Sequence, residues 1–179
     1  AGEIVYRKGK LISSSSRGDG YIGQLMTDNV FYISSIHKNI DFKGELVIRG
    51  EFYIPRQSFK ILLEKGDYED SAVLNERNIC SGAMMSKNPA DTASKNIHFI
   101  AYRYWVDGIE PEDKFKSAPK IEELTKGTHF GVVNNISHVP LTIFHSDTDK
   151  SQVEFILDNM FKSRTELPYR IDGAVIEVN

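Results

Sequence analysis

At 179 residues, 40% hydrophobic and 26% charged, the sequence is typical of a soluble globular protein with one large domain or a tight pair of domains, and excludes a disordered chain. A net charge of −3 excludes a basic field over the whole surface, so contact with DNA would need a local patch or another domain. Cys80 is the single cysteine and no apolar run is long enough for a membrane span, so we expect a cytoplasmic protein without disulfides.

The first segments predict a β-hairpin followed by a tight turn. Residues 3–7 and 11–15 are strand-like, and Lys8-Gly9 supplies the turn between them. In Arg17-Gly18-Asp19-Gly20, exposed backbone N–H groups and Arg17 could hold a phosphate, although a plain hairpin loop is the alternative. Residues 23–35 carry apolar side chains at mixed spacing and predict a short helix.

Residues 44–55 contain the clearest strand pattern. Apolar and polar residues alternate from Leu46 to Ile54, so Arg49 and Glu51 should project from the polar face of a half-buried strand. Gly50 lies between them and predicts a bulge or a close approach to the backbone. The alternative is an ordinary surface strand with an ion pair.

The middle of the chain predicts a helix and then a second long strand. Residues 57–65 have helical spacing, and residues 77–85 are rich in small side chains that allow close packing. Residues 96–106 predict a strand buried on both faces, with Tyr102 and Tyr104 on one side. Such an aromatic pair is either core or a surface for stacking bases.

The last third predicts shorter elements and one long helix. Residues 120–126 indicate one or two helical turns and residues 130–133 a short strand. Residues 150–164 have a continuous apolar stripe, from which we expect a helix that covers one face of a sheet. Residues 172–179 predict a final strand with Asp172 at its mouth. The alternation of strands and helices indicates an α+β fold with a mixed sheet.

Five separated stretches, each weak alone, together match one family in its order along residues 1–179. They are Arg17-Gly18-Asp19-Gly20 with Gly23 and Thr27; Val47-Ile48-Arg49-Gly50-Glu51; Arg77-Asn78 with Gly82; Pro89 and Thr92-Ala93 leading to Phe99-Ile100-Ala101-Tyr102; and Leu167-Pro168-Tyr169-Arg170-Ile171-Asp172-Gly173-Ala174-Val175-Ile176. The chain thereby resembles the adenylation (nucleotidyltransferase) domain of NAD-dependent, bacterial-type DNA ligases. The match would begin just after the nucleophile motif and end in the Asp-Gly-x-Val-Ile strand.

The resemblance implies an ATP-grasp-like nucleotidyltransferase core, with mixed or antiparallel sheets flanked by helices. It also implies a reaction with NAD and Mg²⁺, in which a lysine takes AMP from NAD and passes it to the 5′-phosphate of nicked double-stranded DNA. Glu51 would hold the ribose or assist metal binding, and Asp172 would position the lysine and the nucleotide. Tyr102 and Val175 would pack on the two faces of the adenine.

The same resemblance assigns phosphate contacts to Arg17 and Arg77, and it exposes departures from the family. Glu177 stands where the family has a phosphate-binding lysine, and Met85 where it has a second arginine. The nucleophilic Lys-x-Asp-Gly motif occurs nowhere in the sequence. Arg17 cannot replace that lysine, because an arginine stays protonated.

Two interpretations follow. In the first, the chain is a fragment or subunit of an NAD-dependent DNA ligase, and the lysine, the domain that binds nicotinamide mononucleotide (NMN) and the oligonucleotide-binding fold lie on other segments or a second polypeptide. In the second, it is an inactive scaffold or a nucleotide- or DNA-binding module. The retained site residues favour the first. ATP-dependent ligases and RNA-capping enzymes share the core but fit the motifs less well, and an integrin-binding role for Arg17-Gly18-Asp19 is discounted.

Overall fold

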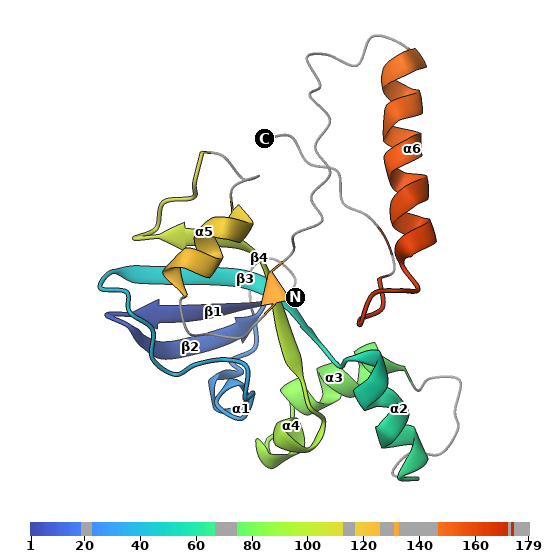
Figure 1. Ribbon diagram of the computed structural model, residues 1–179. Helices are drawn as coiled ribbons and strands as arrows, with labels where there is room; N and C mark the ends of the chain where they lie inside the picture. Colours follow the sequence, from blue (N-terminus) through green and yellow to red (C-terminus); the bar gives the residue numbers. More distant parts are fainter. Residues whose placement is uncertain are drawn as a thin grey trace.

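The computed structural model describes residues 1–18, 23–66, 75–112, 117–125, 131–132, 147–171 and 173. The strands are β1 Gly2–Arg7, β2 Lys10–Ser16, β3 Glu45–Tyr53, β4 His98–Val106 and β5 Gly131–Val132. The helices are α1 Thr27–Val30, α2 Arg56–Glu64, α3 Glu76–Met84, α4 Ala90–Ser94, α5 Ser117–Leu124 and α6 Asp147–Ser163. Figure 1 shows their arrangement.

The strands form one sheet in the order β2-β1-β3-β4-β5. The first four pair antiparallel, and β5 joins β4 in parallel through Ile100 and Ala101. The β1–β2 hairpin closes on Lys8 and Gly9, whose φ angles of +50° and +77° are those a two-residue turn with the twist of the strands requires. The predictions of an α+β class, of a mixed sheet and of this hairpin are confirmed.

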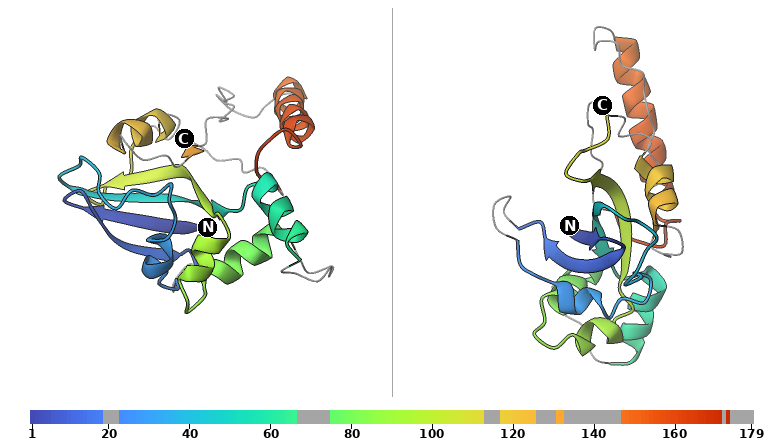
Figure 2. Two further views of the ribbon diagram at one scale, coloured as in Figure 1. Left: turned by 60° about the horizontal axis from the view of Figure 1, so that its bottom comes forward. Right: turned by 90° about the vertical axis from the view of Figure 1, so that its left-hand side faces the viewer.

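The hydrophobic core lies on one face of the sheet. Alternate strand residues such as Ile4, Ile48 and Phe99 are fully buried there, and side chains of α1, α3 and α5 join the same cluster. Figure 2 shows α1, α3 and α4 gathered on one side of the strands. The opposite face receives the other alternate residues, and in β3 these include Arg49 and Glu51.

Most expected elements are present with shifted bounds. The helices expected near residues 23–35, 57–65 and 120–126 and the strand near 130–133 correspond to α1, α2, α5 and β5. Residues 77–85 form a helix, α3, and the short helix α4 was not expected. The strand expected over 96–106 is not buried on both faces along its whole length, because its buried residues are Ile97, Phe99–Ala101 and Tyr104, and the others are partly exposed. Residues 172 and 174–179 of the final strand lie outside the described residues.

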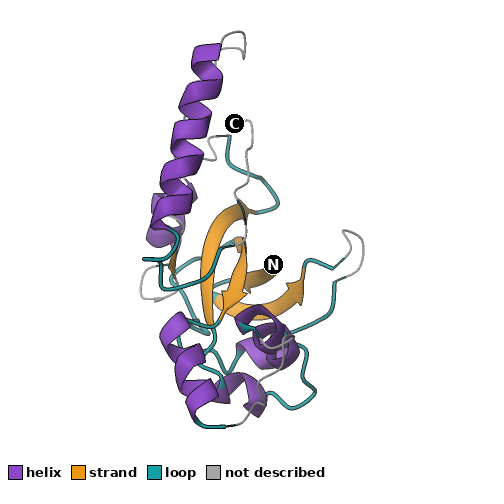
Figure 3. Cartoon of the chain, turned by 90° about the vertical axis from the view of Figure 1, so that its right-hand side faces the viewer, coloured by secondary structure: helices purple, strands orange, loops and turns teal. Residues whose placement is uncertain are grey.

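The expectation that residues 150–164 cover a face of the sheet is wrong. The segment is helical, as α6, but the helix stands away from the strands (Figures 1 and 3). Phe155 and Phe161 are 66% and 42% exposed, and no residue of the apolar stripe is fully buried. A stripe of apolar residues predicts that a helix is amphipathic, but it does not specify the surface that the helix contacts.

The outer edge of the sheet, strand β2, is covered by loop backbone. The amide of Leu11 donates to the carbonyl of Lys38 at 2.9 Å, and that of Ser16 donates to Gln24 at 2.8 Å. Between them, the amide of Ser14 donates to Thr27 Oγ1 at 3.0 Å. Val5 pairs with Ser13 but Tyr6 with Leu11, so one extra residue also bulges this strand.

Candidate functional site

Gly50 lies at a point where two strands approach too closely for a side chain. A Cβ atom on Gly50 would stand 2.3 Å from the carbonyl oxygen of Ile100 and 2.4 Å from Cζ of Phe99. The β3–β4 register also shifts between Arg49 and Gly50. The prediction of a bulge or a close approach is confirmed in both forms.

The shift makes Tyr102 the extra residue of a β-bulge. Arg49 pairs with Arg103 and Gly50 with Ala101, which leaves Tyr102 without an opposite residue on β3. A bulge redirects side chains relative to the regular pleat and is frequent beside functional sites. No residue of β4 marks this bulge in the amino-acid sequence, because its marker is the glycine on the neighbouring strand.

Tyr102 lies among charged groups from three segments. Burial of its half-buried ring raises the pKa of the hydroxyl, and the carboxylate of Glu51 raises that pKa further, whereas Arg49, Arg17 and Arg103 lower it. The phenol therefore stays protonated at neutral pH. Three of the residues expected at the site, Arg17, Glu51 and Tyr102, thus interact electrostatically.

Glu51 borders the beginning of β1. Gly2 pairs with Gly50, so the backbone nitrogen of Ala1 lies 2.7 Å from Oε2 of Glu51. The side chain of Glu51 is 51% exposed, which leaves its carboxylate accessible to a ligand. An ordinary surface strand would pair Arg49 with Glu51. In the structure the guanidinium of Arg49 instead binds the carboxylate of Glu3.

Helix α3 packs against β3 behind this region. Its side chain at Cys80 is buried, which raises the pKa of the thiol to about 12, and the carboxylate of Glu51 also raises it. Arg77 lies on the exposed side of the first turn, three residues before Cys80. Met85, at the position of the family's second arginine, packs against the hydrophobic core.

Residues 167–169, which lead toward Asp172, contact the end of β3 and the start of α2. Nε of Arg56 donates to the carbonyl of Leu167 at 3.0 Å, and the backbone amide of Arg56 donates to that of Pro168 at 2.8 Å. The rings of Tyr53 and Tyr169 meet edge to face at 5.3 Å between centroids. Asp172, Val175, Glu177 and the turn residues Asp19 and Gly20 lie outside the described residues.

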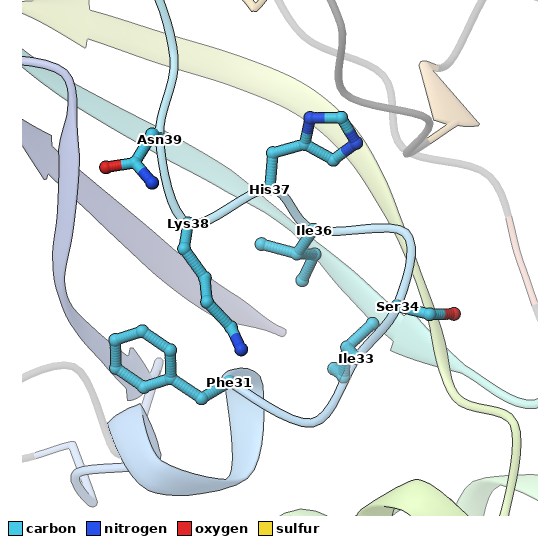
Figure 4. A pocket seen from close by; sticks show the side chains of 7 residues that line it. All are labelled: Phe31, Ile33, Ser34, Ile36, His37, Lys38 and Asn39. Atoms are coloured by element: carbon cyan, nitrogen blue, oxygen red, sulfur yellow. The ribbon is translucent and has the colours of Figure 1, made fainter.

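A hollow of about 320 Å³ lies elsewhere, in the loop after α1 (Figure 4). Lys38 Nζ stands over the ring of Phe31 at 5.5 Å from its centroid. The lining residues are Phe31, Ile33, Ser34, Ile36, His37, Lys38 and Asn39. None of the expected site residues lines this hollow, so it is separate from the region around Tyr102.

No three His, Cys, Asp or Glu side chains in the described ranges are grouped so that they could hold a metal ion. Among the helices the structure describes, none has the length and apolar character needed to cross a bilayer.

The family model of the NAD-dependent DNA ligase adenylation domain matches residues 1–179. The chain belongs to this family. Similar proteins named DNA ligase include one of Brachyspira hyodysenteriae, 31% identical, for which the match covers 99% of this chain and 25% of that protein. Those of Ligilactobacillus salivarius and Bartonella quintana are each 33% identical, and the matches cover 97% and 98% of this chain but 24% and 23% of those proteins. The chain thus spans about a quarter of the length of these curated relatives.

Proposed function

We propose that this chain is the nucleotide-binding core, with an ATP-grasp-like arrangement, of an NAD-dependent DNA ligase and acts as a fragment or subunit of that enzyme. The observation that carries the proposal is the placement of Tyr102 at the β3–β4 bulge, within electrostatic reach of Glu51 and Arg17. An aromatic ring, a carboxylate and a guanidinium group are the side chains that a base, a ribose and a phosphate require.

Each of these groups has a defined task in the proposal. The ring of Tyr102 packs on one face of the adenine of NAD, and Val175 packs on the other. The carboxylate of Glu51 accepts hydrogen bonds from the ribose hydroxyls. Arg17 and Arg77 bind phosphate oxygens as fixed, permanently charged donors. Asp172 orients the nucleotide and the attacking lysine.

The lysine nucleophile would come from a segment ahead of β1 or from a second polypeptide. Because Gly2 pairs with Gly50, a continuation of β1 toward its N-terminal side would run past Glu51 toward Tyr53. A Lys-x-Asp-Gly segment in that place would bring its amine beside the bound nucleotide. That amine attacks the α-phosphorus of NAD, forms a P–N bond and releases NMN, while residues of this chain hold and orient the AMP moiety.

Mg²⁺ and DNA complete the proposal. Mg²⁺ commonly keeps several waters and binds one or two carboxylates together with substrate phosphates, and Glu51 is the described carboxylate placed to contribute. Nicked double-stranded DNA would receive the AMP. The buried, free thiol of Cys80 fits the cytoplasmic location expected for such an enzyme.

Calorimetric titration of the chain with AMP and with NAD, in the presence of Mg²⁺, tests this function. We expect saturable binding, and we expect Glu51→Gln to weaken it by about 10- to 100-fold, since a hydrogen bond to a charged group contributes about 1.5–3 kcal/mol. Glu64→Gln is the matched control, because Glu64 is an exposed acid 3.9 Å from Lys60 on α2.

The outcomes separate the two interpretations of the chain. Absence of binding by the unmodified chain would contradict the proposal and favour an inactive scaffold. If Glu51→Gln and Glu64→Gln weakened nucleotide binding equally, only the role assigned to Glu51 would be contradicted. Restoration of AMP transfer from NAD by a lysine-bearing partner would support the split-enzyme form of the proposal.

A further inference from the structure

Two arginines face each other across the sheet beside the bulge. Arg49 on β3 is paired in register with Arg103 on β4. Like charges directly opposite each other destabilise a strand pair, so each arginine needs its own acid. Nε of Arg49 donates to Oε1 of Glu3 at 2.9 Å, and Nε of Arg103 lies 3.4 Å from Oε1 of Glu110.

Arg49 is held from a second side by the tryptophan of β4. Its guanidinium carbon lies 4.8 Å from the centroid of the Trp105 ring, within the range of a cation–π contact. Glu3 belongs to β1, Arg49 to β3 and Trp105 to β4. This triad of Glu3, Arg49 and Trp105 therefore ties three adjacent strands together on the face that carries Glu51.

The triad lies next to Tyr102, whose orientation is not determined by strand pairing. Arg49 is the last residue before the register shift, and Tyr102 is the residue without an opposite partner. A bulged residue lacks the cross-strand contacts that orient its neighbours. The positive charge of Arg49 also lowers the pKa of the Tyr102 hydroxyl, against the effects of burial and of Glu51.

We propose that Glu3, Arg49 and Trp105 are positioning residues that fix the β3–β4 register at the bulge and so hold the ring of Tyr102 at the angle needed for nucleotide binding. The part that concerns the nucleotide rests on the proposed function, whereas the part that concerns Tyr102 does not. Glu3 attracts the guanidinium of Arg49 toward β1, and Glu110 binds that of Arg103. The two like charges are thereby kept apart, and the bulge stays at Tyr102.

The first test follows the amide signals of Gly50 and Tyr102 and the ring signals of Tyr102 by nuclear magnetic resonance, without nucleotide. We expect Arg49→Gln and Trp105→Leu to shift these signals, and Trp105→Phe, which keeps an aromatic face, to leave them near their original positions. Arg7→Gln is the matched control, because Arg7 and Glu45 form another β1–β3 ion pair, at 2.6 Å, far from the bulge.

The second test measures AMP affinity and thermal unfolding of the same variants. We expect about a tenfold loss of affinity for Arg49→Gln and Trp105→Leu with a cooperative unfolding transition, and a change below twofold for Trp105→Phe and Arg7→Gln. Trp105 is the only tryptophan of the sequence, so its fluorescence should also change in Arg49→Gln.

Unchanged Tyr102 signals in both disruptive variants would overturn the inference. So would equal losses of affinity in Arg49→Gln and Arg7→Gln, because that result would indicate general weakening of the sheet. Should Arg49→Gln not fold, the pair Trp105→Leu and Trp105→Phe decides. Failure of the unmodified chain to bind AMP would contradict the proposed function, and the Tyr102 signals would still test the positioning role.

Discussion

Replacement of Gly50 should have a large local effect. A Cβ atom there would meet a backbone carbonyl, which cannot rotate away as the end of a flexible side chain can. We expect Gly50→Ala to destabilise the fold by about 1–3 kcal/mol, the usual cost of overpacking, as measured by urea unfolding. The loss should be accompanied by displaced Tyr102 signals, because the bulge lies opposite.

Gly82 in α3 provides the control for this substitution. A Cβ atom on Gly82 would meet nothing within 4 Å. Gly82→Ala should therefore stabilise the fold by about 0.5–1 kcal/mol, because alanine loses less conformational freedom in a helix. Equal stability changes in the two variants would show that Gly50 is not sterically restricted.

At the scale of single residues, sequence patterns predict faces but not neighbours. Alternation along residues 44–55 places Arg49 and Glu51 on the polar face, and the structure agrees. The partner of Arg49 is Glu3, 46 positions earlier in the chain. No local pattern specifies such a pair, so the triad beside the bulge escaped the sequence analysis.

At the scale of elements, α2 serves as the anchor for the segment after α6. Nε of Arg56 binds the carbonyl of Leu167, and its terminal nitrogen donates to that of Arg164 at 3.2 Å. We expect Arg56→Gln to accelerate tryptic cleavage after Arg164 and Arg170 severalfold, because the segment loses these contacts. Cleavage is followed by mass spectrometry under native conditions.

Lys60→Gln on the same helix is the control for that measurement. Lys60 is 78% exposed and approaches only Glu64 among the ion pairs of the described residues. Its replacement removes one cleavage site but should leave cleavage after Arg164 and Arg170 unchanged. Identical rates in both variants would mean that Arg56 does not hold the segment.

The elements themselves were more predictable than their packing. Periods of two and 3.6 residues reflect which side of a strand or helix is buried, so β3, β4 and α6 were recognised. The contact surface of α6 was not, because a local pattern carries no information about a distant partner. The parallel addition of β5 to β4 is likewise a long-range pairing.

At the scale of the whole molecule, a buried tyrosine hydroxyl and a buried thiol should make the fold less stable at alkaline pH. Burial raises the pKa of the Tyr6 hydroxyl and of the Cys80 thiol, the latter to about 12. The unfolded chain then loses these protons at lower pH than the folded chain does. We expect the contribution of these two groups to the free energy of unfolding to be constant below about pH 8 and to fall above about pH 9, by up to about 1.4 kcal/mol per pH unit for each group.

Urea unfolding between pH 8 and pH 11 measures this fall. Tyr6→Phe should make the decline above pH 10 less steep, although it removes the hydrogen bond from Tyr6 to the carbonyl of His37 at 2.8 Å and lowers stability at every pH. Tyr32→Phe should leave the slope unchanged, because Tyr32 is 52% exposed. Parallel curves for all three proteins would contradict the assignment to Tyr6.

The cover over β2 bears on how the molecule meets other chains. An open edge strand offers unpaired N–H and C=O groups to any extended peptide, and this is the common route to edge-to-edge aggregation. Here Lys38, Gln24 and Thr27 already occupy that row, and the bulge bends it. Self-association by sheet extension is therefore blocked at the β2 edge. A strand from another chain would have to pair at the opposite edge of the sheet, which β4 and β5 form.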